Sequence, residues 1–156
     1  MKTYNILSID EFKSNIGNNS RLLGIDPGNK NIGFAICDEN KKVATPLKII
    51  RKSNFEYLIN EINKIIKENH IKGIIIGNPL NMDGTSGKSS QSANDFAKNL
   101  SQNTTIPIAM WDERLSSEAS FKITKELGTN VTNRLNKLDK NAAAFILQGA
   151  IDYLSN

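Results

Sequence analysis

The sequence contains a single cysteine and no long apolar run, and each shortage excludes a class of protein. Cys37 has no partner for an intramolecular disulfide and lies in an apolar segment, so we expect a small buried residue in a reducing cytoplasm. No apolar run approaches the roughly 18 residues of a membrane helix. Residues 1–20 also carry charges where a signal peptide is apolar. We therefore expect a cytoplasmic protein without a membrane partner.

The length and composition are those of one soluble domain. A chain of 156 residues is long enough for one real core and short for two. The net charge of +4 and the pI of about 9.2 suit a polyanionic partner such as nucleic acid. An ordinary solvated surface would have the same mild excess of positive charge. Charge therefore supports a functional argument without deciding it.

From residue 21 onward, the apolar spacing alternates between strand and helix periods. It predicts strands over 21–26, 31–37 and 42–50, a helix over 53–69, a strand over 71–77, a helix over 88–102, a strand over 106–111, and helices over 116–127 and 138–154. Three antiparallel strands followed by two parallel ones indicate an α/β, ribonuclease-H-like fold, with a five-stranded mixed sheet flanked by helices. We expect residues 21–156 to form this single nuclease-type domain, and residues 1–20 to be an N-terminal extension outside the core.

Several local features refine these elements. Pro46 predicts an edge strand or a bulge, because proline cannot donate to a sheet ladder. Ser53 and Glu56 have the spacing of a capping box at a helix start. His70, the only histidine, is expected to interact with the end of that helix.

The first predicted strand ends on a carboxylate, Asp26, next to a tight turn that begins at Pro27. Ligands and metals gather at the carboxyl ends of strands in open α/β sheets. Glu113 and Asp139 fall where the chain can return to the same place. Three converging carboxylates predict a divalent metal, Mg²⁺ or Mn²⁺, and phosphodiester chemistry. The alternative for Asp26 is that it only starts the turn.

The sequence allows more than one role for each of the two neighbours of Glu113, Asp112 and Arg114. Asp112 would point to the opposite face of a continued strand, so one of the two acids is not a direct ligand. Asp112 also suits a helix cap or an arginine partner. Arg114 is a candidate substrate-binding residue that could clamp a phosphate, or it could pair with Asp112.

Asp139 opens the last predicted helix, where it could be a plain N-cap that accepts a hydrogen bond near Ala142. The small Ala142 and Ala143 would let that helix approach the sheet closely and bring Asp139 to the metal. The metal-ligand and capping roles both stay open at this point.

Two lysines, Lys30 and Lys88, are further candidates for substrate binding. Lys88 follows a polar loop at a predicted helix start, where free N–H groups bind anions. The alternatives are an exposed turn lysine and a flexible polar loop. The run of residues 87–89 resembles the end of a P-loop, but Met82 stands where that motif requires glycine, which excludes it.

Four segments, in the right order, resemble the motifs of the YqgF family, also called RuvX. They are Gly24–Gly33, Gly77–Gly84, Asp112–Ser116 and Asp139–Gln148. In the second of these, the family often has leucine where Asn78 stands. The resemblance runs from about Arg21 to the C-terminus.

The resemblance implies a ribonuclease-H-like, metal-dependent nuclease of the bacterial cytoplasm, with Asp26, Glu113 and Asp139 as catalytic and metal-binding residues. It implies maturation of the 5′ end of precursor 16S ribosomal RNA, or resolution of Holliday junctions in DNA. We favour the RNA role, because the tie to the resolvase is chiefly an analogy of fold. The expected partners are structured precursor rRNA or branched DNA and ribosomal particles, for a monomer or a homodimer.

Two further classes of function are weaker alternatives. Nucleotide-binding proteins of the actin and sugar-kinase type share a similar hairpin, but they need two domains around a cleft. A ribosome-assembly factor without catalytic activity would have no need for three intact carboxylates. A junction resolvase would act as a symmetric dimer, so a stable monomer would count against that role.

Overall fold

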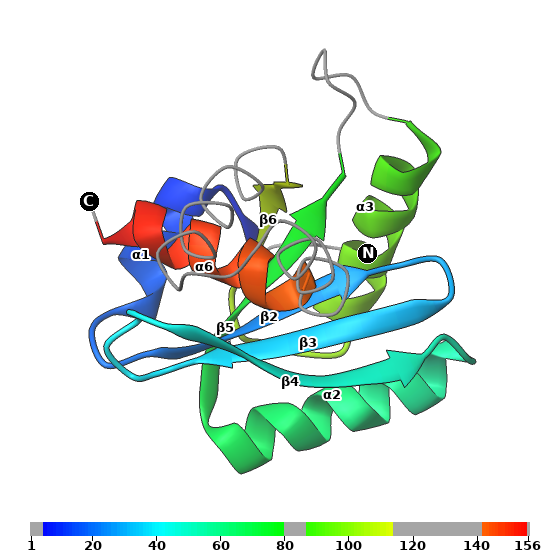
Figure 1. Cartoon of the computed structure of the whole chain (residues 1–156), viewed down its shortest axis with the longest axis horizontal. Coiled ribbons are helices and arrows are strands. Elements are labelled where there is room, and N and C mark those ends of the chain that lie inside the picture. The colour runs from blue at the N-terminus through cyan, green and yellow to red at the C-terminus, as the bar shows by residue number, and fades with distance from the viewer. Residues whose placement is uncertain (1–4, 80–86, 114–141, 156) are drawn as a thin grey trace, which may run out of the picture.

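The computed structural model describes residues 5–79, 87–113 and 142–155, which form a mixed sheet between two layers of helices (Figure 1). The described elements are β1 (Ile6–Leu7), α1 (Ile9–Ile16), β2 (Arg21–Pro27), β3 (Asn31–Cys37), β4 (Ala44–Arg51), α2 (Phe55–Asn69), β5 (Ile71–Asn78), α3 (Lys88–Ser101), β6 (Ile108–Asp112) and α6 (Ala142–Leu154). The predicted helix over 116–127 and the loop that follows it lie outside the described residues, as does the start of the last predicted helix.

The sheet has the order β1-β6-β5-β2-β3-β4. β2, β3 and β4 pair antiparallel, whereas β5 and β6 join the sheet in parallel next to β2. This confirms the predicted change from antiparallel to parallel pairing. It also brings the carboxyl ends of β2, β5 and β6 to one edge of the sheet.

The sheet has six strands instead of the predicted five, because β1 pairs in parallel with β6. The expectation that residues 1–20 lie outside the core is also wrong for α1. Phe12 is fully buried, and its ring occupies the space over Gly73 where a side chain would otherwise lie. A two-residue strand carries no detectable periodicity, so the sequence pattern did not reveal it. Ser8 caps the start of α1: its hydroxyl oxygen accepts a hydrogen bond from the backbone N–H of Glu11 at 3.2 Å.

Each face of the sheet has its own apolar core. α2 and α3 cover one face, where Leu58 and Phe96 pack against isoleucines of the sheet. α1 and α6 cover the other face, where Phe12 and Leu147 lie in a second cluster. β5 contributes to both cores, as expected for a central strand buried on both sides. Among the described residues, no helix is both long enough and apolar enough to cross a membrane.

Local predictions around α2 are confirmed in part. β4 is an edge strand, and its register with β3 shifts next to Pro46. The predicted cap at Ser53 is wrong by one residue: Asn54 Oδ1 accepts from the backbone N–H of Tyr57 at 2.8 Å. His70 ends the helix in a left-handed conformation, and its backbone N–H donates to the Ile66 carbonyl.

Phe12→Ala tests whether α1 belongs to the core. We expect this variant to lose about 3–5 kcal/mol of unfolding free energy in urea, the usual cost of deleting a buried phenylalanine. Val43→Ala is the control, because the Val43 side chain is 61% exposed. It should change stability by less than about 0.5 kcal/mol. Equal stability of the two variants would contradict the packing of α1 on the sheet.

Candidate active site

Asp26 and Glu113 project from the same face of the sheet, at its carboxyl edge. Side chains alternate along a strand. Gly24 of β2 faces α6, and Trp111 of β6 lies in the apolar cluster with α6. Asp26 and Glu113 each follow two residues later, so both carboxylates stand at the α6 face. Both are half-buried.

Gly77 of β5 lies between these two strands and leaves room for the Glu113 carboxylate. A Cβ atom at Gly77 would stand 2.5 Å from Glu113 Oε1 and 2.6 Å from Cδ1 of Ile146. A side chain at this position would therefore displace the ends of the Glu113 and Ile146 side chains. The Glu113 side chain therefore extends over β5, on the side where β2 presents Asp26.

α6 reaches this site because glycines let it approach the sheet. A Cβ atom at Gly24 would stand 2.7 Å from Leu147 Cβ and 3.1 Å from the Ala143 carbonyl oxygen. At Gly33, a Cβ atom would meet Ala143 Cβ at 3.5 Å and Asp26 Cβ at 3.8 Å. The predicted close approach of the last helix is thus confirmed at Ala143. Asp139, which precedes this helix, lies outside the described residues.

Burial and mutual repulsion make the carboxylates resist ionisation. Burial, then repulsion from Asp26 and Asp112, raises the pKa of Glu113 from 4.5 to about 7. Burial also raises the pKa of Asp26. A cation between such carboxylates would remove the repulsion, which is why paired acids with raised pKa values are typical of functional sites.

The donor set fits a hard divalent cation. Asp26 and Glu113 offer carboxylate oxygens, the ligands that Mg²⁺ and Mn²⁺ prefer. No cluster of three potential metal ligands occurs within residues 5–79, 87–113 and 142–155. The third predicted ligand, Asp139, is not among these residues. Cys37 is no alternative donor, because it is buried at the far end of β3 and accepts from the Leu22 backbone N–H at 3.3 Å.

Asp112 lies on the opposite face of β6 from Trp111, as the alternation of side chains predicts. It stands next to Asn78 of β5 in the sheet. There Asn78 Oδ1 accepts from the buried Ser90 hydroxyl at 2.6 Å, which ties α3 to the end of β5. Neither this contact nor the role of Gly77 is visible in the sequence pattern. The one signal for the contact is that Asn78 is a polar residue at the end of an apolar strand.

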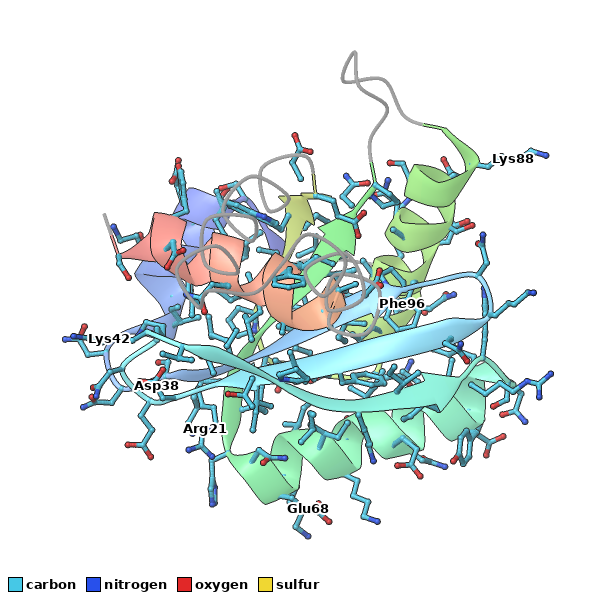
Figure 2. The ribbon with its side chains drawn as sticks, viewed as in Figure 1. Arg21, Asp38, Lys42, Glu68, Lys88 and Phe96 are labelled. Atoms are coloured by element: carbon cyan, nitrogen blue, oxygen red, sulfur yellow. The ribbon has the colours of Figure 1, made fainter. Side chains whose placement is uncertain are left out.

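The predicted substrate-binding residues are only in part described. Lys30 is exposed in the turn between β2 and β3, at the same edge of the sheet as Asp26. Lys88 begins α3, and its side chain extends outward from the molecule (Figure 2). Gly87 caps this helix without a side-chain hydrogen bond. The structure thus brings neither lysine against the carboxylate pair, and Arg114 lies outside the described residues.

Comparison with known proteins identifies the family. Residues 20–153 match the family described as "RuvX: Holliday junction resolvase". The chain belongs to the RuvX family. It is 50% identical over 151 residues to the "Putative pre-16S rRNA nuclease" of Pelagibacter ubique, covering 97% of this chain and all of that protein. A RuvX-type relative of the same name from Ruegeria pomeroyi is 42% identical, covering 96% of this chain and 97% of the relative.

Solved structures confirm the ribonuclease-H-like fold. Thermus thermophilus RuvC in complex with a Holliday junction has a TM-score of 0.55 and 11% identity, covering 88% of this chain and 96% of RuvC. The yeast mitochondrial Holliday junction resolvase Ydc2 has a TM-score of 0.57 and 11% identity, covering 94% of this chain and 84% of Ydc2. At this level of identity, the likeness of this chain to RuvC and Ydc2 concerns the fold alone.

Glu113→Gln should remove a pH dependence of stability. In the metal-free protein, native Glu113 keeps its proton between pH 4.5 and about 7, whereas the unfolded chain loses it. Because the native state binds more protons there, stability falls as pH rises through this window. The expected loss is about 1–2 kcal/mol, after discounting for solvent screening. Urea unfolding in EDTA across this window measures it, and an unchanged slope in Glu113→Gln would refute the assignment. Glu68→Gln, at an exposed site on α2, is the control.

Gly77→Ala should displace the Glu113 carboxylate and Ile146. We expect a loss of about 1–3 kcal/mol in unfolding free energy, the usual cost of overpacking, together with weaker Mn²⁺ binding by calorimetry. Gly33→Ala is the matched control, because its new methyl group would meet its nearest neighbour at an ordinary 3.5 Å. Normal Mn²⁺ affinity in Gly77→Ala would show that the position of Glu113 does not matter for the metal.

Proposed function

We propose that this chain is a metal-dependent nuclease that hydrolyses phosphodiester bonds in precursor 16S ribosomal RNA. The observation that carries the proposal is the pair of half-buried carboxylates at the carboxyl end of the sheet, where Glu113 extends over Gly77 and is repelled by the nearby Asp26. Membership of the RuvX family and the names of its relatives support a nuclease and the RNA substrate.

In the proposed mechanism, Asp26, Glu113 and Asp139 hold Mg²⁺ or Mn²⁺. When bound, such ions activate the attacking water and stabilise the charge on the attacking and leaving oxygens. Asp26 is fixed at the end of β2, and the missing side chain at Gly77 leaves room for the carboxylate of Glu113. Glu113 must lose its proton to become a ligand, so its pKa of about 7 favours activity at neutral and higher pH.

Substrate contacts in this proposal come from basic residues around the carboxylates. Lys30 is exposed on the hairpin next to Asp26, and Lys88 is exposed at the start of α3. Backbone N–H groups at a helix start bind phosphate, and Lys88 adds charge there. Arg114, which follows Glu113, is proposed as a third phosphate contact.

A Holliday junction resolvase is the second candidate, favoured by the description of the family. The RNA role is preferred because relatives of 50% and 42% identity carry a name that specifies pre-16S rRNA. The resolvases of known structure share only 11% identity. The proposal places the enzyme in the cytoplasm with ribosomal particles, as a monomer or a homodimer. The reduced Cys37 is compatible with that compartment.

Asp26→Asn should abolish cleavage without harming the fold. The variant would hold the metal less well and lose several kcal/mol of transition-state stabilisation. We therefore expect a cleavage rate at least about a hundredfold lower. Metal-free stability should be equal or higher, because the change relieves repulsion with Glu113. The assay offers precursor rRNA and a four-way DNA junction, side by side, with Mg²⁺ or Mn²⁺.

Glu39→Gln is the control for this assay, because Glu39 is exposed after the far end of β3. It should cleave like the wild type. Full activity of Asp26→Asn would refute the assignment of Asp26 as a catalytic metal ligand. Cleavage of the junction but not of the rRNA would replace the RNA role with the resolvase role.

A further inference from the structure

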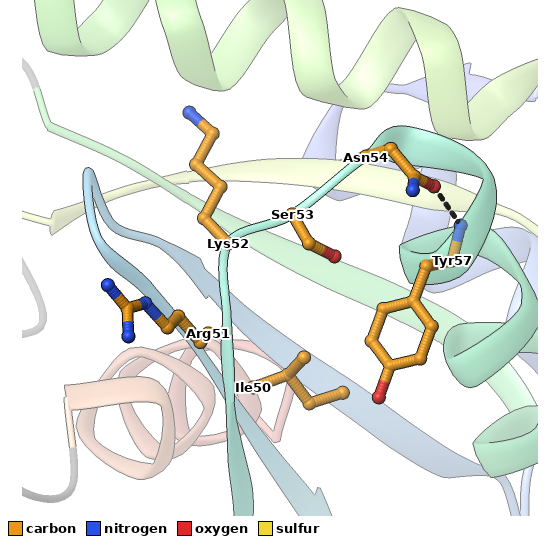
Figure 3. A pocket seen from close by; sticks show the side chains of 6 residues that line it. All are labelled: Ile50, Arg51, Lys52, Ser53, Asn54 and Tyr57. Carbon is orange, nitrogen blue, oxygen red and sulfur yellow. Dashed lines mark hydrogen bonds between the residues drawn. The ribbon is translucent and has the colours of Figure 1, made fainter.

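A hollow at the junction of β4 and α2 takes no part in the arrangement described so far. It has a volume of about 550 Å³ and is open to solvent (Figure 3). It is lined by Ile50, Arg51, Lys52, Ser53, Asn54 and Tyr57. It is a shallow depression, so a group bound there would keep part of its surface in solvent.

The two cations at this hollow are not neutralised. Arg51 and Lys52 are exposed, and neither forms an ion pair with any residue that the structure describes. Lys48, on the same strand, differs because it pairs with Glu61 at 3.2 Å. The Lys52 backbone N–H donates to the Lys30 carbonyl at 2.8 Å, so the hairpin brings a third cation beside them.

Tyr57 offers an exposed aromatic surface on the other side of the hollow. Its side chain is 47% exposed and makes no ring contact with the other described residues. Its backbone N–H donates to Asn54 Oδ1. This bond fixes the first turn of α2 and thereby the backbone position from which the Tyr57 side chain extends. In Figure 3, the Arg51 and Lys52 side chains extend to one side of the connecting segment, and the ring lies on the side of Ile50.

The hollow spans the edge strand β4: Ile50 and Tyr57 lie on the α2 face of the sheet, whereas Arg51 lies on the face that carries Asp26. In the sheet register, Asp26 is opposite Gly33, and Gly33 is opposite Ile49. These residues therefore share one face, and Arg51, two residues after Ile49, belongs to the same face. Ala143 of α6 lies over Gly33, but Asn31, which is opposite Arg51, is exposed, and Ile49 is 56% exposed. The path from Asp26 to β4 covers two strand spacings, about 10 Å.

We propose that this surface binds a single-stranded segment of RNA that continues from the scissile phosphodiester. Arg51 and Lys52 bind backbone phosphates, and Tyr57 stacks on a base that enters the hollow. The segment is single-stranded because a base must leave its helix to stack on an aromatic side chain. This inference rests on the proposed nuclease function, to which it adds a substrate subsite.

Binding without metal tests the subsite apart from catalysis. A short, unstructured, fluorescein-labelled RNA is titrated with the full chain in EDTA at several salt concentrations. Tyr57→Ala should bind about tenfold more weakly, whereas Tyr57→Phe keeps the ring and the affinity. Arg51→Ala and Lys52→Ala should each flatten the log–log salt slope by about 0.7. Lys48→Ala, which removes a paired cation from the same strand, should leave the slope unchanged.

Steady-state kinetics on precursor rRNA separates this subsite from the catalytic proposal. Arg51→Ala and Tyr57→Ala should raise KM and leave kcat unchanged, because neither residue touches the reacting atoms. Wild-type cleavage with unchanged affinity and KM in both variants would overturn the subsite while the nuclease stands. Weaker binding by these variants in a protein that never cleaves RNA would support the subsite and refute the nuclease. Failure of the wild type to bind the RNA would overturn the subsite.

Discussion

α6 lies so close to the centre of the sheet that Gly24 has no room for a methyl group beside Leu147 and Ala143. This close approach is the constraint on which the candidate site depends. It places Ala143 within contact distance of Gly33, beside Asp26, and it places Ile146 next to the Glu113 carboxylate over Gly77. A helix further from the sheet would bury less apolar surface and would leave these carboxylates in water. Their pKa values would then be ordinary, and a bound cation would relieve less electrostatic repulsion.

The rest of the fold compensates for this electrostatic cost. Burying two carboxylates near each other destabilises the metal-free protein, as the raised pKa of Glu113 shows. The compensation comes from the central strand β5, where Ile74 and Ile76 pack into one core and Ile75 into the other. The N-terminal segment contributes as well, because Phe12 covers Gly73 and Tyr153 of α6 donates to Asp10 of α1 at 3.0 Å. α1 thus helps to keep α6 against the sheet.

The fold was largely predictable from local patterns, whereas the fine geometry of the site was not. β3 has the predicted bounds because seven residues of apolar spacing lie between two polar turns. β1 was missed because two residues give no period, and Phe12 became part of the core only through a tertiary contact. Asp26 and Glu113 were predicted from their places after strands. The position of the Glu113 carboxylate over Gly77 was not, because it depends on strands that are distant in sequence and on side-chain direction.

Protection of the edge strand β4 is an alternative explanation for the cations at its end, but it accounts for fewer of the observed features. Exposed edge strands often carry lysine, arginine or proline to prevent pairing with other chains. Pro46 already interrupts the ladder of β4, and Lys48 is held by Glu61. Edge protection requires charges anywhere along the strand, but Arg51 and Lys52, which pair with none of the described acids, stand at the end of the sheet where Asp26 lies. There they meet a hollow and an exposed ring, neither of which protects an edge. A role in holding a polyanion accounts for the position of all three features at once.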